Sequence, residues 1–222
     1  MVNLGDLFPN FKAESTIGTI QFHDWLGDSW GILFSHPADF TPVCTTELSR
    51  VAELVGEFEK RGVKPIALSC DSVSAHEKWI DDIKSYGNQA KPGFPYPIIA
   101  DEGRELAVQL GMLDPNEKDK DGLPLTCRAV FIVAPDKKLR LSMLYPATTG
   151  RNFDEILRAI DSLQLTDNKK VATPADWKSG SDCMVLPTVQ DEEAISLFPK
   201  GITVMPMPSG KAYLRITPYP DS

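Results

Sequence analysis

The chain has 222 residues, of which 42% are hydrophobic, so it is large and apolar enough to bury a substantial core. Its formal net charge of −8 argues against nucleic acid or an anionic membrane surface as the main partner, because both require a basic face. The N-terminus lacks a signal-peptide pattern, and no run approaches the roughly 18 apolar residues of a membrane span, so we expect no stable membrane insertion.

In the first half of the chain, apolar runs alternate with amphipathic segments. Residues 30–35 predict a buried strand, and residues 44–61 predict a helix that Gly62 caps. A second strand is expected at 63–70 and a second helix at 74–87, where apolar side chains recur on one side. This alternation is typical of α/β proteins with a parallel sheet.

The pattern continues with a strand at 96–101 and a short helix at 101–112, for which Asp101 is the expected N-cap. Residues 127–145 predict two strands joined by a turn, and residues 152–165 predict a last helix. Because the hairpin adds antiparallel strands, the predicted fold class is α/β, with a mixed central sheet flanked by helices. Two aperiodic stretches are expected to form loops: residues 87–97 and 113–124.

A change of composition near Thr166 predicts a domain boundary. The segment that follows is polar and rich in proline and glycine, so the expected division is a larger domain at 1–165 and a smaller C-terminal domain or arm at 166–222. Its later apolar pieces are short and broken by prolines. We therefore expect them to pack on the first domain or on another subunit rather than to form a core of their own.

The cysteines and histidines predict neither a disulfide framework nor a metal centre. No C-x-x-C is present, and the three histidines complete no zinc-binding spacing. We therefore expect four reduced thiols, no bound metal or cofactor, and a cytoplasmic protein. The cysteines are at positions 44, 70, 127 and 183.

Two candidate nucleophiles lie close together in the sequence. Ser29 is in GDSWG, which fits the G-x-S-x-G pattern of serine hydrolases. However, a nucleophile elbow follows a strand, and here the apolar run comes after the serine, so a turn serine is the alternative interpretation. Cys44 opens the helix at 44–61, where unpaired N–H groups and the helix dipole stabilise a thiolate, the reactive form. Thr41 can offer a hydroxyl to the sulfur or to a substrate oxygen; the alternative for Cys44 is a small buried thiol at a helix start.

Pro37, Thr41 and Cys44 form the pattern P-x-x-x-T-x-x-C, within SHPADFTPVCTTEL. With this motif, and with LYPATTGRNFDEILR and the tail, the chain resembles the peroxiredoxins, in particular the one-cysteine branch of the peroxiredoxin 6 type. The resemblance implies a thioredoxin-like fold with a smaller C-terminal domain that supports a homodimer. It also implies thiol-dependent reduction of hydrogen peroxide and organic, including phospholipid, hydroperoxides.

The resemblance assigns roles to individual residues. Cys44 would be the peroxidatic nucleophile, Thr41 and Arg128 would hydrogen-bond the sulfur or the peroxide, and Pro37 would shield the pocket from water. A free thiol is about 3% ionised at pH 7, so full ionisation gains only roughly thirtyfold and aligned donors must supply the rest of the rate. The alternative for Arg128 is a strand arginine that pairs with a surface carboxylate. Three further residues match positions that support the site: His36, Glu47 and Arg151.

The tail suggests which thiol reduces the oxidised protein. Two-cysteine relatives carry V-C-P-A-G-W there, whereas this chain has VATPADW, with Thr173 in the place of the resolving cysteine. A sulfenic acid on Cys44 would then persist until an external thiol attacks it, or would oxidise further. Within this type the expected reductant is glutathione delivered by a glutathione transferase. Cys183, in the tail, is the one plausible substitute within the chain.

Two other interpretations of the function stay open. The resemblance implies a second, calcium-independent phospholipase A2 activity with a His23–Ser29–Asp136 set, and all three residue types are present. The second alternative is a non-enzymatic redox sensor or holdase, because oxidised Cys44 has to react with a thiol of another molecule and could pass its oxidation to a partner. The donors expected beside Cys44 favour the peroxidase, since a sensor needs only an accessible thiolate.

Overall fold

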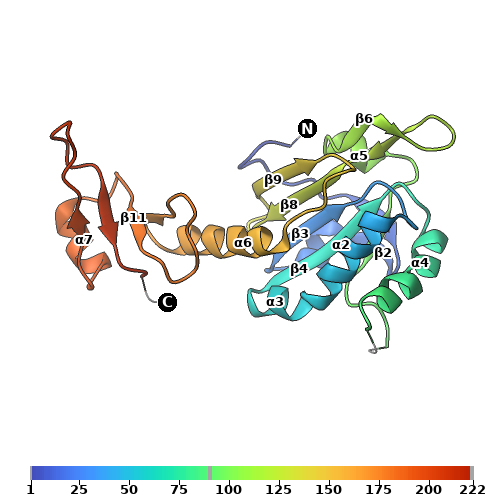
Figure 1. Cartoon of the computed structure of the whole chain (residues 1–222), viewed down its shortest axis with the longest axis horizontal. Helices are drawn as coiled ribbons and strands as arrows, with labels where there is room; N and C mark the ends of the chain where they lie inside the picture. The colour runs from blue at the N-terminus through green and yellow to red at the C-terminus, as the bar shows by residue number, and fades with distance from the viewer. Residues whose placement is uncertain (1, 90–91, 221–222) are drawn as a thin grey trace. The chain divides into compact units, whose positions relative to one another are not determined.

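The computed structural model describes residues 2–89 and 92–220 and divides into two compact units (Figure 1). The first unit is Met1–Phe153 and the second is Asp154–Ser222. The boundary lies before the one placed at 165/166 from composition, because helix α6, at Phe153–Asn168, belongs almost wholly to the second unit.

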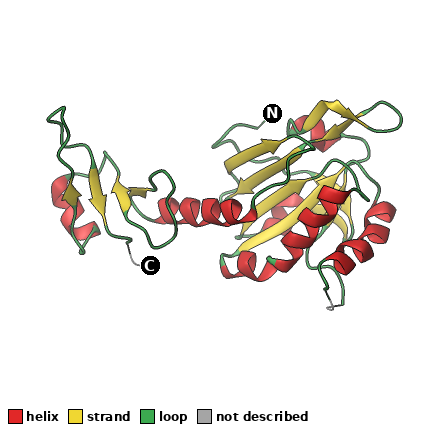
Figure 2. Ribbon diagram, in the orientation of Figure 1, coloured by secondary structure: helices red, strands yellow, loops and turns green. Residues whose placement is uncertain are grey.

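The first unit contains a seven-stranded mixed sheet in the order β2-β1-β5-β4-β3-β8-β9. Figure 2 shows the strands in yellow and the helices in red. The central strands β3, β4 and β5 are parallel, and the flanking strands are antiparallel to their neighbours. The expected α/β sheet is therefore confirmed, whereas the β1–β2 hairpin was not expected. The strands are β1 Lys12–Ser15, β2 Gly18–Gln21, β3 Trp30–Ser35, β4 Val63–Ser69, β5 Ile98–Ala100, β8 Arg128–Val133 and β9 Leu139–Tyr145.

Helices cover both faces of this sheet because its central strands carry apolar side chains on both sides. On one face, Leu33 of β3 belongs to a core cluster that includes Phe22 of α1 and Leu106 of α5. On the other face, Phe34 lies against Phe58 of α3, with ring centroids 6.1 Å apart, and α2 packs on α4. The helices are α1 Phe22–Leu26, α2 Pro42–Glu53, α3 Val55–Lys60, α4 Val73–Tyr86 and α5 Glu105–Gln109.

Two predicted helices differ from the observed ones. The single helix expected at 44–61 is divided at Leu54 into α2 and α3, and it begins two residues earlier, at Pro42. The helix expected at 101–112 is shorter, and its N-cap position is Arg104 with a left-handed backbone (φ 60°). The Asp101 carboxylate nevertheless caps it, because it accepts the N–H groups of the first helical turn at 3.1 and 2.7 Å.

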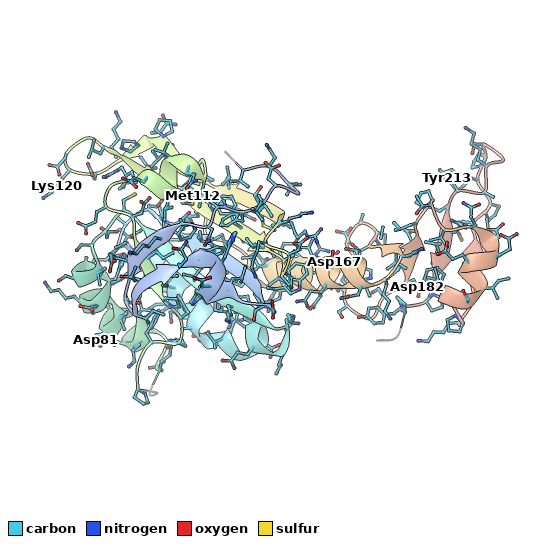
Figure 3. The ribbon with its side chains drawn as sticks, turned by 180° about the vertical axis from the view of Figure 1, so that it is seen from behind. Asp81, Met112, Lys120, Asp167, Asp182 and Tyr213 are labelled. Carbon is cyan, nitrogen blue, oxygen red and sulfur yellow. The ribbon has the colours of Figure 1, made fainter. Side chains whose placement is uncertain are left out.

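The stretch 113–124, expected to be a loop, contributes to a hairpin instead. Strands β6, at Leu113–Lys118, and β7, at Pro124–Thr126, pair antiparallel, with Lys120 at the tip (Figure 3). The loop expected at 87–97 contains neither helix nor strand in its described part, and residues 90–91 lie outside the described residues.

The second unit has its own small sheet, in the order β10-β11-β13-β12. The expectation that the tail forms no core was wrong: Trp177, 2% exposed, packs with apolar side chains such as Val171 and Phe198. Tyr213, in contrast, is exposed on this unit (Figure 3). The elements are β10 Val171–Ala172, β11 Cys183–Val185, α7 Asp191–Leu197, β12 Thr203–Val204 and β13 Arg215–Thr217. Among the described residues of the whole chain, no helix has the length and apolarity needed to cross a bilayer.

Candidate active site

Cys44 lies in the first turn of α2 and is fully buried, with 0% exposure. Thr41 is the N-cap residue, but its hydroxyl donates to the Ala38 carbonyl at 2.8 Å instead of capping the helix. Among the described residues, the backbone N–H groups of Val43 and Cys44 have no recorded acceptor. Unpaired N–H groups at a helix N-terminus attract negative charge, so the turn favours a thiolate.

Arg128 reaches Cys44 from β8, which pairs with β3. Its Nη1 donates to Cys44 Sγ at 3.3 Å and to Glu47 Oε2 at 2.8 Å. Its Nε and Nη2 both donate to the Ala147 carbonyl, at 2.9 and 2.5 Å. The alternative of a surface ion pair is therefore wrong, because Arg128 is 3% exposed and its carboxylate partner is buried as well.

Glu47 joins the two arginines of the site. Arg151 donates its backbone N–H and Nε to Glu47 Oε1, at 2.7 and 3.0 Å, and its Nη2 to Oε2 at 2.7 Å. Burial alone would raise the pKa of Glu47, but the charge and hydrogen bonds of Arg151, together with the charge of Arg128, hold that pKa below its usual value. The ionised Glu47 thus fixes the position of Arg128 beside Cys44.

His36 and Pro37 follow β3 and are both buried. His36 Nε2 lies 2.8 Å from Asp39 Oδ1, and His76 Nδ1 lies 2.7 Å from Asp39 Oδ2. By residue type these three groups could hold a metal ion, and their ligand atoms lie within 4.8 Å of one another. Ligands of tetrahedral zinc are about 3.3 Å apart, however, so the shorter distances here are those of hydrogen bonds.

Sequence reasoning did not find Asp39, His76 or the Ala147 carbonyl. Asp39 and His76 are 37 residues apart in the chain and meet only through the packing of α4. The sequence does place Asp39 three residues after His36, in the loop between the strand at 30–35 and the helix at 44–61. That short spacing could have suggested a contact between the two side chains. No pattern identifies a backbone carbonyl as the partner of an arginine.

The other three thiols are poor nucleophiles. Burial, with the nearby Asp101, raises the pKa of Cys70 to about 11, and burial also raises the pKa values of Cys127 and Cys183. Cys183 was the one plausible substitute within the chain, but it is 0% exposed and its thiol donates to the Ser181 carbonyl at 3.6 Å. These surroundings argue against Cys183 as a substitute resolving cysteine.

The hydrolase set is not assembled in this structure. Ser29 precedes β3, whereas Cys44 lies beyond the opposite end of that strand. His23 Nε2 is 2.7 Å from the Phe8 carbonyl, and Asp136 accepts from Arg140 at 3.1 Å. No hydrogen bond among the described residues joins any two members of the set. Hydrolysis at Ser29 would require His23 to leave Phe8, and loss of lysophospholipid release in a Ser29→Ala variant is the result that would support it.

The chain is similar to known proteins over nearly its whole length. The AhpC/TSA family matches residues 4–142, and the C-terminal domain of 1-Cys peroxiredoxin matches residues 162–201. Peroxiredoxin-6 of Gallus gallus is 68% identical, over 98% of each chain. A cysteine-to-serine mutant of the peroxiredoxin 6 of Arenicola marina superposes with a TM-score of 0.97, at 66% identity over 100% of both chains. A yeast mitochondrial 1-Cys peroxiredoxin gives a TM-score of 0.89, at 46% identity over 98% of this chain and 100% of its own.

The chain therefore belongs to the AhpC/TSA family and, within it, to the one-cysteine peroxiredoxins of the peroxiredoxin 6 type. Its fold is the thioredoxin-like fold of that family, and its activity is the thiol-dependent reduction of peroxides.

Proposed function

We propose that Cys44 is the peroxidatic residue of this enzyme and that Arg128 and Thr41 act directly beside it. The observation that carries the proposal is the 3.3 Å contact between Arg128 Nη1 and the fully buried Cys44 sulfur. A buried thiolate requires such a partner, because burial without one disfavours the charged form. Among the four thiols, only Cys44 has a guanidinium as a hydrogen-bond partner in the described structure.

In the first step, the Cys44 thiolate attacks the terminal oxygen of the hydroperoxide ROOH. The S–O bond forms as the O–O bond breaks, the sulfur is oxidised to a sulfenic acid, and RO⁻ takes up the proton that the thiol released and leaves as ROH. Four of the five Arg128 N–H groups are committed to described partners, so one Nη2 hydrogen is available for the developing negative charge. Because Thr41 donates to Ala38, its oxygen can accept the peroxide hydrogen.

An open depression of about 540 Å³ lies against Thr41 and Pro42. Phe40, Trp79 and Tyr86 contribute aromatic walls to it. Such a surface suits the apolar part of an organic hydroperoxide, including a phospholipid hydroperoxide, and hydrogen peroxide needs no such support. We expect the wild type to have a lower KM for an alkyl hydroperoxide than for hydrogen peroxide, and Phe40→Ser to lose this difference. An alkyl hydroperoxide KM that is the same in Phe40→Ser as in the wild type would exclude the role of this surface.

In the second step, an external thiol attacks the sulfenic acid, giving a mixed disulfide and water, and a second thiol molecule releases the Cys44 thiol. We propose glutathione as that thiol, with a glutathione transferase as the protein that delivers it to a buried sulfur. The yeast 1-Cys peroxiredoxin structure concerns thiol resolution through the glutathione and thioredoxin systems, which supports this class of reductant. The raised pKa values of Cys70, Cys127 and Cys183 disfavour an internal thiol.

The test of this proposal is the fate of the oxidised protein. After one equivalent of peroxide without added thiol, we expect intact-mass analysis to show one added oxygen and no disulfide. Glutathione should then replace the added oxygen with one disulfide-linked glutathione. Excess glutathione should restore the reduced protein, and it should do so faster when glutathione transferase is present. A Cys183→Ser variant serves as the control. A disulfide within the chain that disappears in this variant would contradict the external-thiol step.

We also propose that the protein is a cytoplasmic homodimer. All four thiols are unpaired, as expected in a reducing compartment. The second unit exposes large apolar side chains, including Ile195 at 79% and Val204 at 48%, which favour a partner surface. Sedimentation at micromolar concentration should give a dimer mass that an Ile195→Glu, Val204→Glu double variant lowers, and cell fractionation should recover the protein with cytoplasmic markers.

A further inference from the structure

His76 lies on α4, fully buried, and takes no part in the chemistry described above. Its Nδ1 faces Asp39 Oδ2 at 2.7 Å and its Nε2 faces the Ile99 carbonyl at 3.1 Å. Burial would raise the pKa of Asp39, but the hydrogen bonds of His36 and His76 lower it to about 2, so Asp39 is ionised. A carboxylate and a carbonyl only accept hydrogen bonds. Both ring nitrogens of His76 therefore face acceptors, a geometry that fits two N–H donors.

Asp39 is held from three directions at the start of the catalytic turn. One carboxylate oxygen accepts from His76 and the other from His36, while its backbone N–H donates to Asp71 Oδ2 at 2.9 Å. With its side chain 1% exposed, the Asp39 carboxylate depends on these partners rather than on water. Loss of one donor would leave a buried charge incompletely satisfied and would free the loop.

The next residue shows why this anchoring is needed. Phe40 has a left-handed backbone, with φ at 55°, which a bulky side chain rarely adopts. Its own ring is 56% exposed, so its packing alone does not hold this conformation. Strained conformations of this kind persist only where the surroundings fix them. Thr41, the N-cap of the helix that carries Cys44, follows directly.

A second contact from α4 holds the other side of the same turn. Trp79 donates its Nε1–H to Thr45 Oγ1 at 3.2 Å, and the Thr45 hydroxyl donates to the Thr41 carbonyl at 2.9 Å. Because Trp79 follows His76 by about one helical turn, both side chains project from the same face of α4. This face contacts the loop before Thr41 through His76 and the first turn of α2 through Trp79.

We propose that His76, as an imidazolium bound to Asp39, is a positioning residue that holds the left-handed turn at Phe40 and thereby places Thr41 and Cys44 for reaction with peroxide. The proposal rests on Cys44 being the peroxidatic residue. It assigns a functional role to a residue of α4 that touches neither the peroxide nor the sulfur.

The protonation of His76 can be observed in the wild-type protein. With only three histidines in the chain, ¹⁵N-labelled histidine gives a simple NMR spectrum at neutral pH. We expect both His76 ring nitrogens to carry hydrogen. A neutral ring, with one nitrogen lacking hydrogen, would overturn the proposal irrespective of how any variant folds.

Two amide variants separate the two hydrogen bonds of His76. In His76→Asn the amide nitrogen replaces Nδ1 and still donates to Asp39, whereas in His76→Gln it replaces Nε2 and donates to Ile99 only. We expect single-turnover oxidation of Cys44 by hydrogen peroxide to slow about 100-fold in His76→Gln, as misplacement by an ångström can cause. In His76→Asn the loss should stay within about 5-fold. Glu77→Gln, exposed on the same helix, is the matched control and should react like the wild type.

Each outcome has a defined meaning. Slow oxidation in His76→Gln with rescue in His76→Asn supports the proposal. Equal slowing in both variants, or no slowing in either, overturns it while leaving Cys44 as the peroxidatic residue. Failure of the wild type to form an adduct on Cys44 would instead overturn the proposed function itself. If either variant does not fold, the protonation of His76 in the wild type decides.

Discussion

A Cys44→Ser variant is expected to lose all thiol-dependent peroxide consumption above the rate of the thiol alone. A serine hydroxyl at this position stays protonated beside Arg128, and oxygen cannot cycle through an oxidised state as sulfur does. Because the first step needs a nucleophile that also accepts the peroxide oxygen, no neighbouring group can replace it. Steady-state consumption of hydrogen peroxide with glutathione supplied measures this loss.

The matched control for Cys44→Ser is Cys127→Ser. Cys127 is also buried, but burial and the nearby Asp114 raise the pKa of its thiol, so it contributes no nucleophile. We expect the Cys127→Ser variant to consume peroxide within about twofold of the wild type. Substantial turnover in Cys44→Ser, or an equal loss in both variants, would show that the reactive thiol lies elsewhere or that the losses reflect folding.

An Arg128→Lys variant is expected to react with peroxide about 100- to 1,000-fold more slowly than the wild type. Lysine keeps one positive charge, but its single ammonium cannot contact the Cys44 sulfur, the Glu47 carboxylate and the Ala147 carbonyl in the geometry of a planar guanidinium. The loss should appear in the rate constant of Cys44 oxidation, measured by rapid mixing at several peroxide concentrations. Reduction by glutathione should change less.

Arg50→Lys is the control for Arg128→Lys. Arg50 lies on the same helix as Cys44, but its side chain is 48% exposed and pairs with Glu53 at the surface. Exposed ion pairs contribute little, so this variant should match the wild type in rate and in unfolding midpoint. An Arg128→Lys enzyme with wild-type oxidation kinetics would remove the guanidinium from the mechanism and leave the helix N-terminus as the main support of the thiolate.

The sequence predicted those elements of the fold whose side chains carry a periodic pattern. Residues 30–35 are buried throughout, and their strand β3 is where the apolar run placed it. The break at Leu54 was missed because the helical spacing of apolar residues continues through it, and this spacing predicts a single helix. The β6–β7 hairpin was missed because β6, LDPNEK, is mostly polar and has no alternating apolar pattern, and β7 is only three residues long. The small core around Trp177 depends on pairings between distant short strands, which no local pattern encodes.

For the candidate site, sequence and structure contribute different parts. The helix start, Cys44 and Thr41 followed from local chemistry, and the family resemblance added Arg128 and Glu47, which the structure places in contact. The local argument suggested that Thr41 offers its hydroxyl to the sulfur or to a substrate oxygen. In the structure the Thr41 hydroxyl instead donates to the Ala38 carbonyl, a contact within the turn before α2. Long-range contacts such as Asp39 with His76 arise only from tertiary packing.

The most direct test of the central claim is to locate the oxidised atom. Wild type and Cys44→Ser are mixed with one equivalent of hydrogen peroxide and a sulfenic-acid trap, and the adduct is mapped by peptide mass analysis. The account predicts one adduct per chain, on Cys44, formed within the mixing time at micromolar peroxide and absent from the variant. An adduct on another cysteine, or equal labelling of the variant, would contradict Cys44 as the peroxidatic residue.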